Sequence, residues 1–462
     1  MDPLVWRVAA VVFLGPFMTG LDSTVVNVSL AVIRGELQAS ITAAQWIVGG
    51  YLLALALMLP LSGWLVDRVG AKRLYLWCFA GFTLASLLCG LARTMEELIV
   101  VRVIQGMAGG LLAPMAQLMI ARVAGRHMAR VMGYTVVPIL IAPILGPVVA
   151  GAVLKYASWP WLFYLNLPVG VVAVAMAAFL LPEDTAELQK RPFDFLGFLV
   201  LSPGLASLLY GLGHAAHLGG ALALLAGALL TAAFVWHALR KKSAALIDVR
   251  LFGNRIFSTA AATQFLSNGL AYAGGFLVPL YLITGCGLTP DQAGWLLAST
   301  GLGMMCSFPL MGNVTERFGC RAVSVSGAFL ALVGTATFLW MIPDRFSPAL
   351  TVAGLFIRGL GQGAISIPSV SAAYASVPRG SLAAASTAIN IVQRLGGPLA
   401  TTVTAIVISF SAQYFTAVGP RAFTAAFVVL FGLHVLGLLA ANRLPARVHQ
   451  DLGEQGKKTE QP

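Results

Sequence analysis

The feature that most constrains this chain is a series of apolar stretches of roughly 20 residues that recurs along its whole length. A helix of that length crosses a hydrocarbon core of about 30 Å. The chain is 58% hydrophobic and 10% charged, with a mean hydropathy of +0.86, which is far from the composition of soluble globular proteins. A β-barrel would show alternating segments of about 10 residues instead. The sequence therefore predicts an all-α polytopic membrane protein.

Fourteen spans can be placed, and the first is retained because its apolar run is too long for the core of a signal peptide. The predicted spans cover residues 7–31, 44–66, 75–92, 98–121, 131–154, 162–182, 195–213, 219–238, 257–284, 291–314, 322–342, 348–371, 382–411 and 422–442. An even number of spans places both termini on the same side of the membrane.

The basic residues indicate which side that is. Most of them lie in the terminal segments and in one set of loops, whereas the other set of loops contains only Arg34, Arg93, Lys155, Arg345 and Arg421. Because loops rich in Lys and Arg stay in the cytoplasm, we expect both termini to be cytoplasmic in a multi-pass protein of the cell inner membrane. The net charge of +12 is then a topology signal and not a sign of nucleic-acid binding.

Asp22 is the one acidic residue, out of 17, that falls deep inside a predicted span. A carboxylate at the centre of a spanning helix costs roughly 2.5–3.5 kcal/mol on insertion scales, so we expect it to carry a proton. Arg102 on the fourth span lies at a similar predicted depth, since Asp22 is roughly 22 Å from one surface and Arg102 about 8 Å from the other. A guanidinium favours the ionised carboxylate and burial opposes it. A static pair that locks two helices is the alternative.

The two halves of the chain repeat each other weakly. Residues 63–73 (GWLVDRVGAKR) recur as 312–321 (GNVTERFGCR), and residues 102–106 (RVIQG) have a distant echo in 358–363 (RGLGQG). Duplicated halves are typical of transporters, whose substrate site lies between them near the middle of the bilayer.

With these motifs the chain resembles the major facilitator superfamily, and within it the fourteen-span drug:proton antiporters of the EmrB/QacA type. Residues 21–27 (LDSTVVN) are similar to the first-span motif of that branch, 142–151 (APILGPVVAG) to its fifth-span antiporter motif, and 159–170 (WPWLFYLNLPVG) to its sixth-span entry. The chain departs from the usual pattern at Ala142, Ala150, Pro160 and Glu316.

The resemblance implies a major facilitator fold of two six-helix bundles with two additional central helices. We expect an N-terminal bundle at 1–182, two extra spans with a basic linker at 183–256, a C-terminal bundle at 257–443 and a disordered cytoplasmic tail at 444–462. The implied function is proton-coupled antiport of amphipathic drugs or toxic compounds by alternating access. It is driven by the proton gradient with no cofactor and no metal. We expect a monomer that binds small molecules and protons, and some relatives use a periplasmic adaptor protein.

The motif at 63–73 and its copy are expected to gate the cytoplasmic side. Gly63 permits close helix approach, Gly70 suits a tight turn, and Asp67 can pair with a cation or cap a helix end. By resemblance, Asp67 stabilises the outward-facing state. A basic loop that only sets topology is the alternative, although it does not explain Asp67. The gate residues are Gly63, Asp67, Arg68, Gly70, Arg73, Glu316 and Arg317.

The fifth-span motif combines small residues with prolines. Gly146, Pro147 and Gly151 are expected to break or kink the span and to keep it slim, so that neighbouring helices approach closely. In antiporters that resemble this one, such packing is thought to block leak. Ordinary helix packing is the alternative.

Polar and bulky residues on several spans could line a substrate cavity. The candidates are Met18, Trp46, Tyr51, Gln105, Gln264, Asn268, Gln362, Asn390 and Arg394. Contacts between helices are the alternative for most of them, with Arg394 as the exception at mid-membrane. Because Asp22 cannot neutralise Arg102, Arg358 and Arg394 together, the interior is compatible with anionic or zwitterionic substrates.

Other functions remain open at this stage. One is a dedicated exporter of a single metabolite such as an amino acid, siderophore or organic acid, and another is a non-transporting membrane sensor. An ATPase is disfavoured because no Gly-x-x-x-x-Gly-Lys-Ser/Thr loop is present. An enzyme is disfavoured because the six histidines pair with no carboxylate at metal-ligand spacing. The five scattered cysteines indicate neither a disulfide framework nor a zinc site.

Overall fold

The computed structural model describes residues 2–184, 192–215, 217–342, 346–414 and 423–446. These residues contain helices and no strand. Thirteen helices are long and apolar enough to cross a membrane, and one bent pair, α3 (Ile41–Met58) with α4 (Leu61–Val69), makes a fourteenth span with a bend of 57°. The predicted all-α polytopic fold is therefore confirmed.

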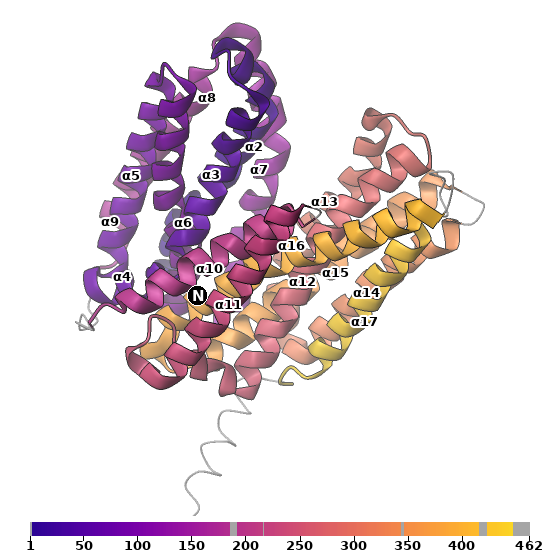
Figure 1. Cartoon of the computed structure of the whole chain (residues 1–462). Coiled ribbons are helices and arrows are strands. Elements are labelled where there is room, and N and C mark those ends of the chain that lie inside the picture. The colour runs from indigo at the N-terminus through magenta and orange to yellow at the C-terminus, as the bar shows by residue number, and fades with distance from the viewer. Residues whose placement is uncertain (1, 185–191, 216, 343–345, 415–422, 447–462) are drawn as a thin grey trace, which may run out of the picture.

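The chain forms two helical bundles that diverge from each other toward one end (Figure 1). The core of the N-terminal bundle is packed around Phe79, Phe82 and Leu112, which are completely buried. Besides α3 and α4, this bundle contains α1 (Pro3–Val12), α2 (Leu14–Glu36), α5 (Ala71–Leu91), α6 (Met95–Ala124), α7 (Met128–Tyr156), α8 (Pro160–Tyr164) and α9 (Asn166–Leu180).

The C-terminal bundle has an aromatic core in which the rings of Phe338 and Phe427 stack with centroids 5.1 Å apart and both meet Tyr281 edge-on. The bundle consists of α12 (Arg255–Leu280), α13 (Pro290–Phe318), α14 (Cys320–Met341), α15 (Pro348–Ala375), α16 (Leu382–Tyr414) and α17 (Thr424–Asn442).

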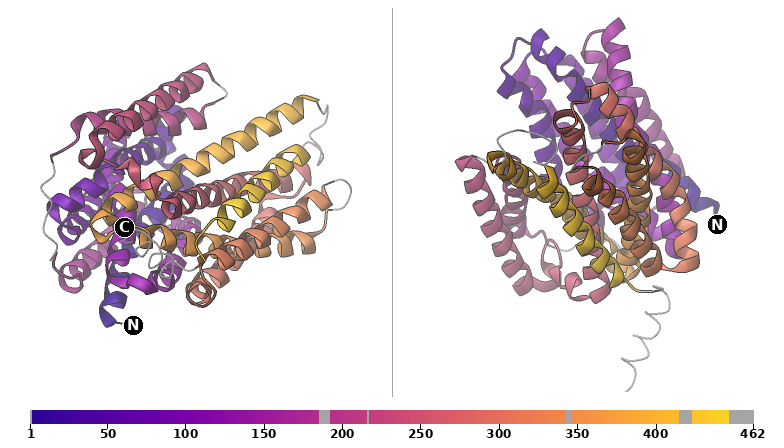
Figure 2. Two further views of the ribbon diagram at one scale, coloured as in Figure 1. Left: turned by 90° about the horizontal axis from the view of Figure 1, so that it is seen from below. Right: turned by 90° about the vertical axis from the view of Figure 1, so that its right-hand side faces the viewer.

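Two further helices, α10 (Phe195–Gly213) and α11 (Leu218–Lys241), pack on each other between the two bundles in sequence. The α10 helix is bonded to both bundles: Ser202 Oγ donates to the carbonyl of Leu57 in α3 (3.1 Å), and Thr402 Oγ1 of α16 donates to the carbonyl of Leu212 (2.8 Å). The α10 helix therefore bridges the two bundles, and the view from below shows the pair along one side of the molecule (Figure 2).

Asp194 anchors this pair at the start of α10. Its carboxylate accepts hydrogen bonds from the backbone N–H of Gly197 and Leu246 and from Lys241 Nζ at 2.7 Å, and it meets His237 Nε2 at 2.9 Å. Burial opposes the charge, yet the bonds from Lys241 and His237 outweigh it and lower the pKa of Asp194. One side chain thus joins α10, α11 and the linker that follows them.

The fifth span was expected to break or kink at its Gly-Pro motif, and the structure excludes the break. The α7 helix continues through Pro147 as a single helix from Met128 to Tyr156. A proline removes one backbone hydrogen bond, but in a long apolar helix the remaining bonds and the neighbouring helices maintain the segment.

Several predictions fall on residues outside the described ranges. These include Arg345 and Arg421, two of the five basic residues of the loops that carry few, and most of the expected disordered tail, 447–462. The first residue of that tail, Leu444, is fully buried, and its carbonyl accepts a hydrogen bond from Arg321 Nε at 2.6 Å.

Candidate functional site

Asp22 is the centre of a buried polar network in the N-terminal bundle. Its Oδ2 lies 2.5 Å from Nη1 of Arg102, and its Oδ1 accepts hydrogen bonds from the side-chain amides of Asn166 (2.8 Å) and Gln105 (3.2 Å). Asp22 is 2% exposed and Arg102 1%. The two residues expected at a similar depth are therefore in direct contact, and three donors stabilise the negative charge.

A second layer of hydrogen bonds fixes the amides around Asp22. Ser86 Oγ accepts from Gln105 Nε2 (3.1 Å) and Asn166 Nδ2 (2.9 Å) and donates to the carbonyl of Phe163. Asn166 had no predicted role, although its amide interrupts the apolar sixth-span motif. That interruption was the available signal.

Arg102 has partners other than Asp22. Its Nη1 also donates to Gln105 Oε1 (2.7 Å), its Nε donates to the carbonyl of Ile47 (3.4 Å), and its guanidinium carbon lies 4.1 Å from the ring centre of Tyr51. The guanidinium would therefore remain solvated by protein groups after protonation of Asp22.

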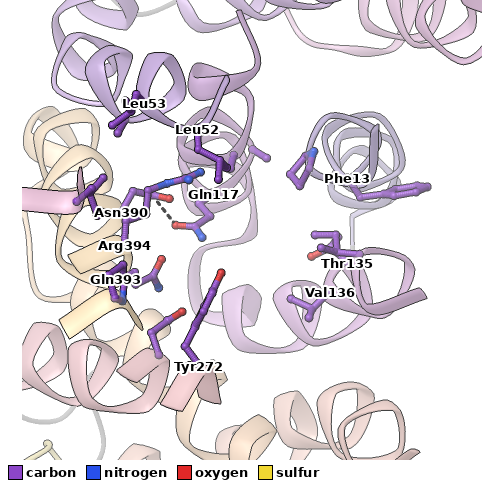
Figure 3. A pocket seen from close by; sticks show the side chains of 18 of the residues that line it. Phe13, Leu52, Leu53, Gln117, Thr135, Val136, Tyr272, Asn390, Gln393 and Arg394 are labelled. Carbon is purple, nitrogen blue, oxygen red and sulfur yellow. Dashed lines mark hydrogen bonds between the residues drawn. The ribbon is translucent and has the colours of Figure 1, made fainter. Parts of the chain in front are cut away.

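A cavity of about 600 Å³ lies between the two bundles (Figure 3). The helices of the N-terminal bundle contribute mostly apolar side chains to it, with Gln117 and Thr135 as polar exceptions. The C-terminal bundle contributes a polar wall, and α10 adds a further section that includes Tyr210 and His214. The residues of the polar wall are Asn268, Tyr272, Asn390, Gln393 and Arg394.

Three of the predicted cavity residues, Asn268, Asn390 and Arg394, line this cavity. Six others do not: Met18, Trp46, Tyr51, Gln105, Gln264 and Gln362. The reasons differ from residue to residue.

The six residues pack or bond elsewhere. Met18 is buried in the N-terminal core, and Trp46 is 45% exposed on the outside of the molecule. Gln264 Nε2 donates to the carbonyl of Ser366 and to Ser369, and Gln362 Nε2 donates to Ser267. Tyr51 and Gln105 belong to the Asp22 network. Residue type alone cannot show which face of a helix turns toward the cavity.

Gln117 was not among the predicted cavity residues, yet it joins the two bundles at the cavity wall. Its Oε1 accepts hydrogen bonds from Asn390 Nδ2 (3.0 Å) and from the hydroxyl of Tyr374 (3.1 Å).

The first loop motif lies at the end of the molecule that carries both chain ends, which we call the termini face. Here Asp67 borders a cavity of about 490 Å³ together with Leu4, Arg122 and Arg379. A Cβ on Gly63 would lie 3.0 Å from Thr387 Oγ1 and 3.2 Å from the carbonyl of Ala383, so α4 and α16 approach closely at this point.

The turn of the same motif depends on Gly70, whose φ is +96°. The following helix, α5, is capped by Asp184, whose Oδ1 accepts from the backbone N–H of Ala71 at 2.8 Å. Lys72 Nζ contacts Glu183 Oε1 at 2.8 Å, and this bond, with the charge of Arg73 nearby, lowers the pKa of Glu183.

The second copy of the motif makes an ionic contact between the bundles. Glu316 on α13 accepts from Arg130 Nη2 (2.5 Å) and lies 3.0 Å from His127 Nδ1, both at the start of α7. The predicted gate arginines behave differently, since Arg68 stacks on Trp64 and Arg317 on Phe318, neighbours on their own helices.

The antiporter motif separates into a packed part and an open part. A Cβ on Gly146 would lie 2.6 Å from Thr24 Cβ, so this glycine is required for the contact between α7 and α2. Gly151 has no atom within 4 Å of such a Cβ, and Pro147 is exposed. The expected close approach at Gly151 is therefore wrong.

The described part of the chain contains no group of three or more His, Cys, Asp or Glu side chains that could hold a metal ion.

The comparisons with known proteins agree with this arrangement. A sequence model of the Major Facilitator Superfamily matches residues 12–401 and again 256–459. A multidrug resistance protein B homolog of Mycobacterium tuberculosis (strain ATCC 25618 / H37Rv) is 34% identical over 420 residues, which cover 89% of this chain and 77% of that protein.

Two solved structures share the fold. The human organic anion transporter MFSD10 (TETRAN) superimposes with a TM-score of 0.64 at 17% identity, covering 96% of this chain and all of that one. A double Trp mutant of XylE superimposes with a TM-score of 0.66 at 15% identity, covering 96% of each chain. At this identity the structures show the fold alone. Together with the sequence matches, they place this multi-pass membrane protein in a family of transporters: the chain belongs to the major facilitator superfamily.

Proposed function

We propose that the protein is a secondary active exporter that exchanges protons for amphipathic drugs or toxic compounds across the cell inner membrane. The observation that carries this proposal is the sealed network around Asp22, in which the one acidic side chain deep inside a described span contacts Arg102. The multidrug resistance protein B homolog at 34% identity supports a drug as the substrate class.

Asp22 has the contacts of a proton carrier. In the ionised form it accepts from Arg102, Gln105 and Asn166. Protonation cancels the attraction to Arg102, but that guanidinium still has Gln105 Oε1 and the face of Tyr51. Both protonation states are thus supplied with partners, which a reversible carrier requires.

The arrangement of the bundles supports alternating access. Contacts between the bundles gather near the termini face, where Ser62 bonds Thr387 (2.7 Å) and Glu316 bonds Arg130, and the bundles diverge at the opposite end (Figure 1). With both termini in the cytoplasm, as the positive-inside rule indicates, this conformation is the outward-facing state. Return to the inward-facing state requires these bonds to break.

We further propose that the carrier works as a monomer without a cofactor. Each charge that crosses the membrane contributes about 2.3 kcal/mol per 100 mV, so the proton gradient can drive transport without ATP.

The decisive experiment is Asp22→Asn in proteoliposomes loaded with a pH-sensitive dye. The substitution keeps the size of the side chain but removes its charge and its proton exchange, and it leaves one acceptor oxygen where the carboxylate has two. We expect substrate-driven proton movement to disappear while the variant elutes as a monodisperse protein. Glu96→Gln, at an exposed position in the first turn of α6, is the matched control and should couple like the wild type. Normal coupling in Asp22→Asn would refute the proposed carrier.

A growth screen separates this function from its alternatives. Cells that overproduce the protein should resist several unrelated toxic amphipathic compounds. Resistance to a single metabolite analogue would indicate a dedicated exporter, and no resistance together with no transport would indicate a sensor.

A further inference from the structure

We infer that the central cavity selects amphipathic organic anions, with Arg394 as the partner of their carboxylate. This inference rests on the proposed export function and specifies the substrate class of the same cavity. It follows from the charges that line the cavity, from the hydrogen bonds that Arg394 lacks, and from the division between polar and apolar walls.

Charge is distributed unevenly around the cavity. Among the described residues that line it, Arg394 is the only one with a permanent charge, and none is an Asp or a Glu. A cationic substrate would therefore have no counter-ion and would be repelled by a guanidinium in a low-dielectric space. An anion meets the opposite situation, because its charge and that of Arg394 are neutralised together.

Asp22 does not supply the missing negative charge. Its Oδ2 bonds Arg102 and its Oδ1 bonds Asn166 and Gln105, so both oxygens are engaged inside the N-terminal bundle. In the described part of the chain Arg394 has no hydrogen bond and no salt bridge. Arg394 is half-buried and faces the cavity. Because a guanidinium in a low-dielectric space is normally paired, a ligand is the natural source of its partner.

The groups beside Arg394 suit a carboxylate. Asn268 lies on the same wall, and its amide likewise makes no hydrogen bond within the described residues, so its N–H group is available to a ligand. Gln117 uses its Oε1 to accept from Asn390 and Tyr374, which leaves its amide N–H groups available as donors. A planar guanidinium with amide donors nearby is a typical carboxylate site.

The opposite wall suits an apolar body. Figure 3 shows Arg394 and Tyr272 on one side of the cavity and Phe13 on the other. Val136 lies on the same side as Phe13, and Ile139, one helical turn further along α7, also lines the cavity. On the α10 side, the rings of Tyr210 and His214 stack with centroids 4.3 Å apart. An aromatic ring with one carboxylate matches this division between walls, and about 600 Å³ is enough for a drug-sized molecule.

Three probes with one ring system and three charges test the inference: 1-naphthylacetate (anion), 1-naphthylacetamide (neutral) and 1-naphthylmethylammonium (cation). Binding to the purified full-length protein in detergent should favour the anion over the amide by about 10-fold, the size expected for one charge-assisted pair. The cation should bind more weakly than the amide. In Arg394→Gln the anion and the amide should bind about equally, and Arg394→Lys should restore part of the difference.

Arg93→Gln is the matched control because Arg93 is an exposed arginine in the loop before α6, away from the cavity lining. It should leave the anion preference unchanged. A wild-type preference for the cation, or an anion preference that survives in Arg394→Gln, would overturn the inference.

Charge movement gives an independent readout. If the same number of protons is exchanged per substrate, export of the anion moves one more charge than export of the amide. A potential of 100 mV, set with valinomycin and potassium in proteoliposomes, should then change the limiting gradient of the anion about 50-fold more than that of the amide. Equal dependence on potential would contradict anion transport.

The two proposals fail separately. If Asp22→Asn keeps normal proton coupling while Arg394→Gln loses the anion preference, the proposed carrier is wrong and the substrate class stands. If Asp22→Asn abolishes coupling and the wild type prefers the cationic probe, the carrier stands and the substrate class is wrong.

Discussion

Arg102 and Arg358 occupy corresponding positions on the fourth helix of each half, but their surroundings are opposite. Arg102 is paired with Asp22 at 2.5 Å and stacks on Tyr51. Arg358 has no carboxylate partner in the described chain and donates instead to the carbonyl of Leu270 at 2.5 Å. The arginine of the repeated motif is thus present in both halves. In the described chain only the N-terminal half provides a carboxylate, that of Asp22, as its partner.

The space beside Gly274, which we call the slot, shows how the C-terminal bundle holds Arg358 without a carboxylate. A Cβ on Gly274 would lie 1.6 Å from Nη2 of Arg358, so the guanidinium occupies space that only a glycine leaves free. The C-terminal bundle holds this cation by shape and a backbone carbonyl, whereas the N-terminal bundle holds Arg102 by a titratable charge. We infer that protonation acts on the N-terminal bundle and that the C-terminal bundle provides the scaffold and the substrate wall.

The largest effect is expected from Arg102→Met, which leaves Asp22 buried without its cation. Breaking a buried pair on one side costs about 3–5 kcal/mol, so the thermal unfolding midpoint in detergent should fall strongly. The double variant Asp22→Leu with Arg102→Met removes both charges and should recover most of the stability, although it cannot transport. If the double variant is as unstable as the single one, the unpaired charge of Asp22 does not explain why the N-terminal half depends on its arginine.

Asp194→Asn tests an acid that locks helices without carrying a proton. Losing the charge that binds Lys241 and His237 should cost about 2 kcal/mol, whereas Asp291→Asn at the exposed start of α13 should change little. Because the pKa of Asp194 is lowered in the folded state, its contribution is complete above the unfolded-state pKa of about 3.9 and is lost as the pH falls through the lower folded-state pKa.

Thermal unfolding of wild type and Asp194→Asn should therefore differ by a constant amount at neutral pH and converge in strong acid. Proton coupling in proteoliposomes should persist. Loss of coupling in Asp194→Asn would remove the distinction between this acid and Asp22.

The sequence was sufficient to predict the membrane spans and the depth of the charged residues within them. Fourteen spans followed from apolar length alone, and the similar depth of Asp22 and Arg102 in the membrane followed from counting residues at 1.5 Å each. Rotation about a helix axis does not follow in this way. Trp46 and Asn268 both fall in apolar spans, yet the first is on the outside of the molecule and the second lines the cavity.

Contacts between residues far apart in the chain could not be predicted from the sequence either. Gln117 accepts from Tyr374 and Asn390, more than 250 residues away, and no local pattern marks such a pairing. Gly146 and Gly151 belong to one motif, but only the position of Thr24 distinguishes the packed glycine from the open one.

Gly146→Ala tests how tightly the helix that carries Asp22 must be held. The added methyl would meet Thr24, two residues beyond Asp22, and overpacking of this kind costs typically about 1–3 kcal/mol. Gly151→Ala adds the same methyl in open space and should lie within about 0.5 kcal/mol of the wild type. Thermal unfolding and proton coupling should both decline in Gly146→Ala alone. Equal behaviour of the two variants would show that the contact between α2 and α7 does not constrain Asp22.

The smallest effect is expected from Arg358→Met, although the same substitution at Arg102 is expected to be the most damaging. Removal of Arg358 strands no carboxylate; it loses one hydrogen bond to Leu270, worth about 1–2 kcal/mol, and gains the desolvation energy of a buried cation. The two terms nearly cancel, so the unfolding midpoint should shift little. In Arg358→Met the slot beside Gly274 is no longer filled by a guanidinium, so Gly274→Ala should be harmful in the wild type and better tolerated in that background. If Arg358→Met is as destabilising as Arg102→Met, the stability of each half depends on the arginine itself and not on whether a carboxylate is left unpaired.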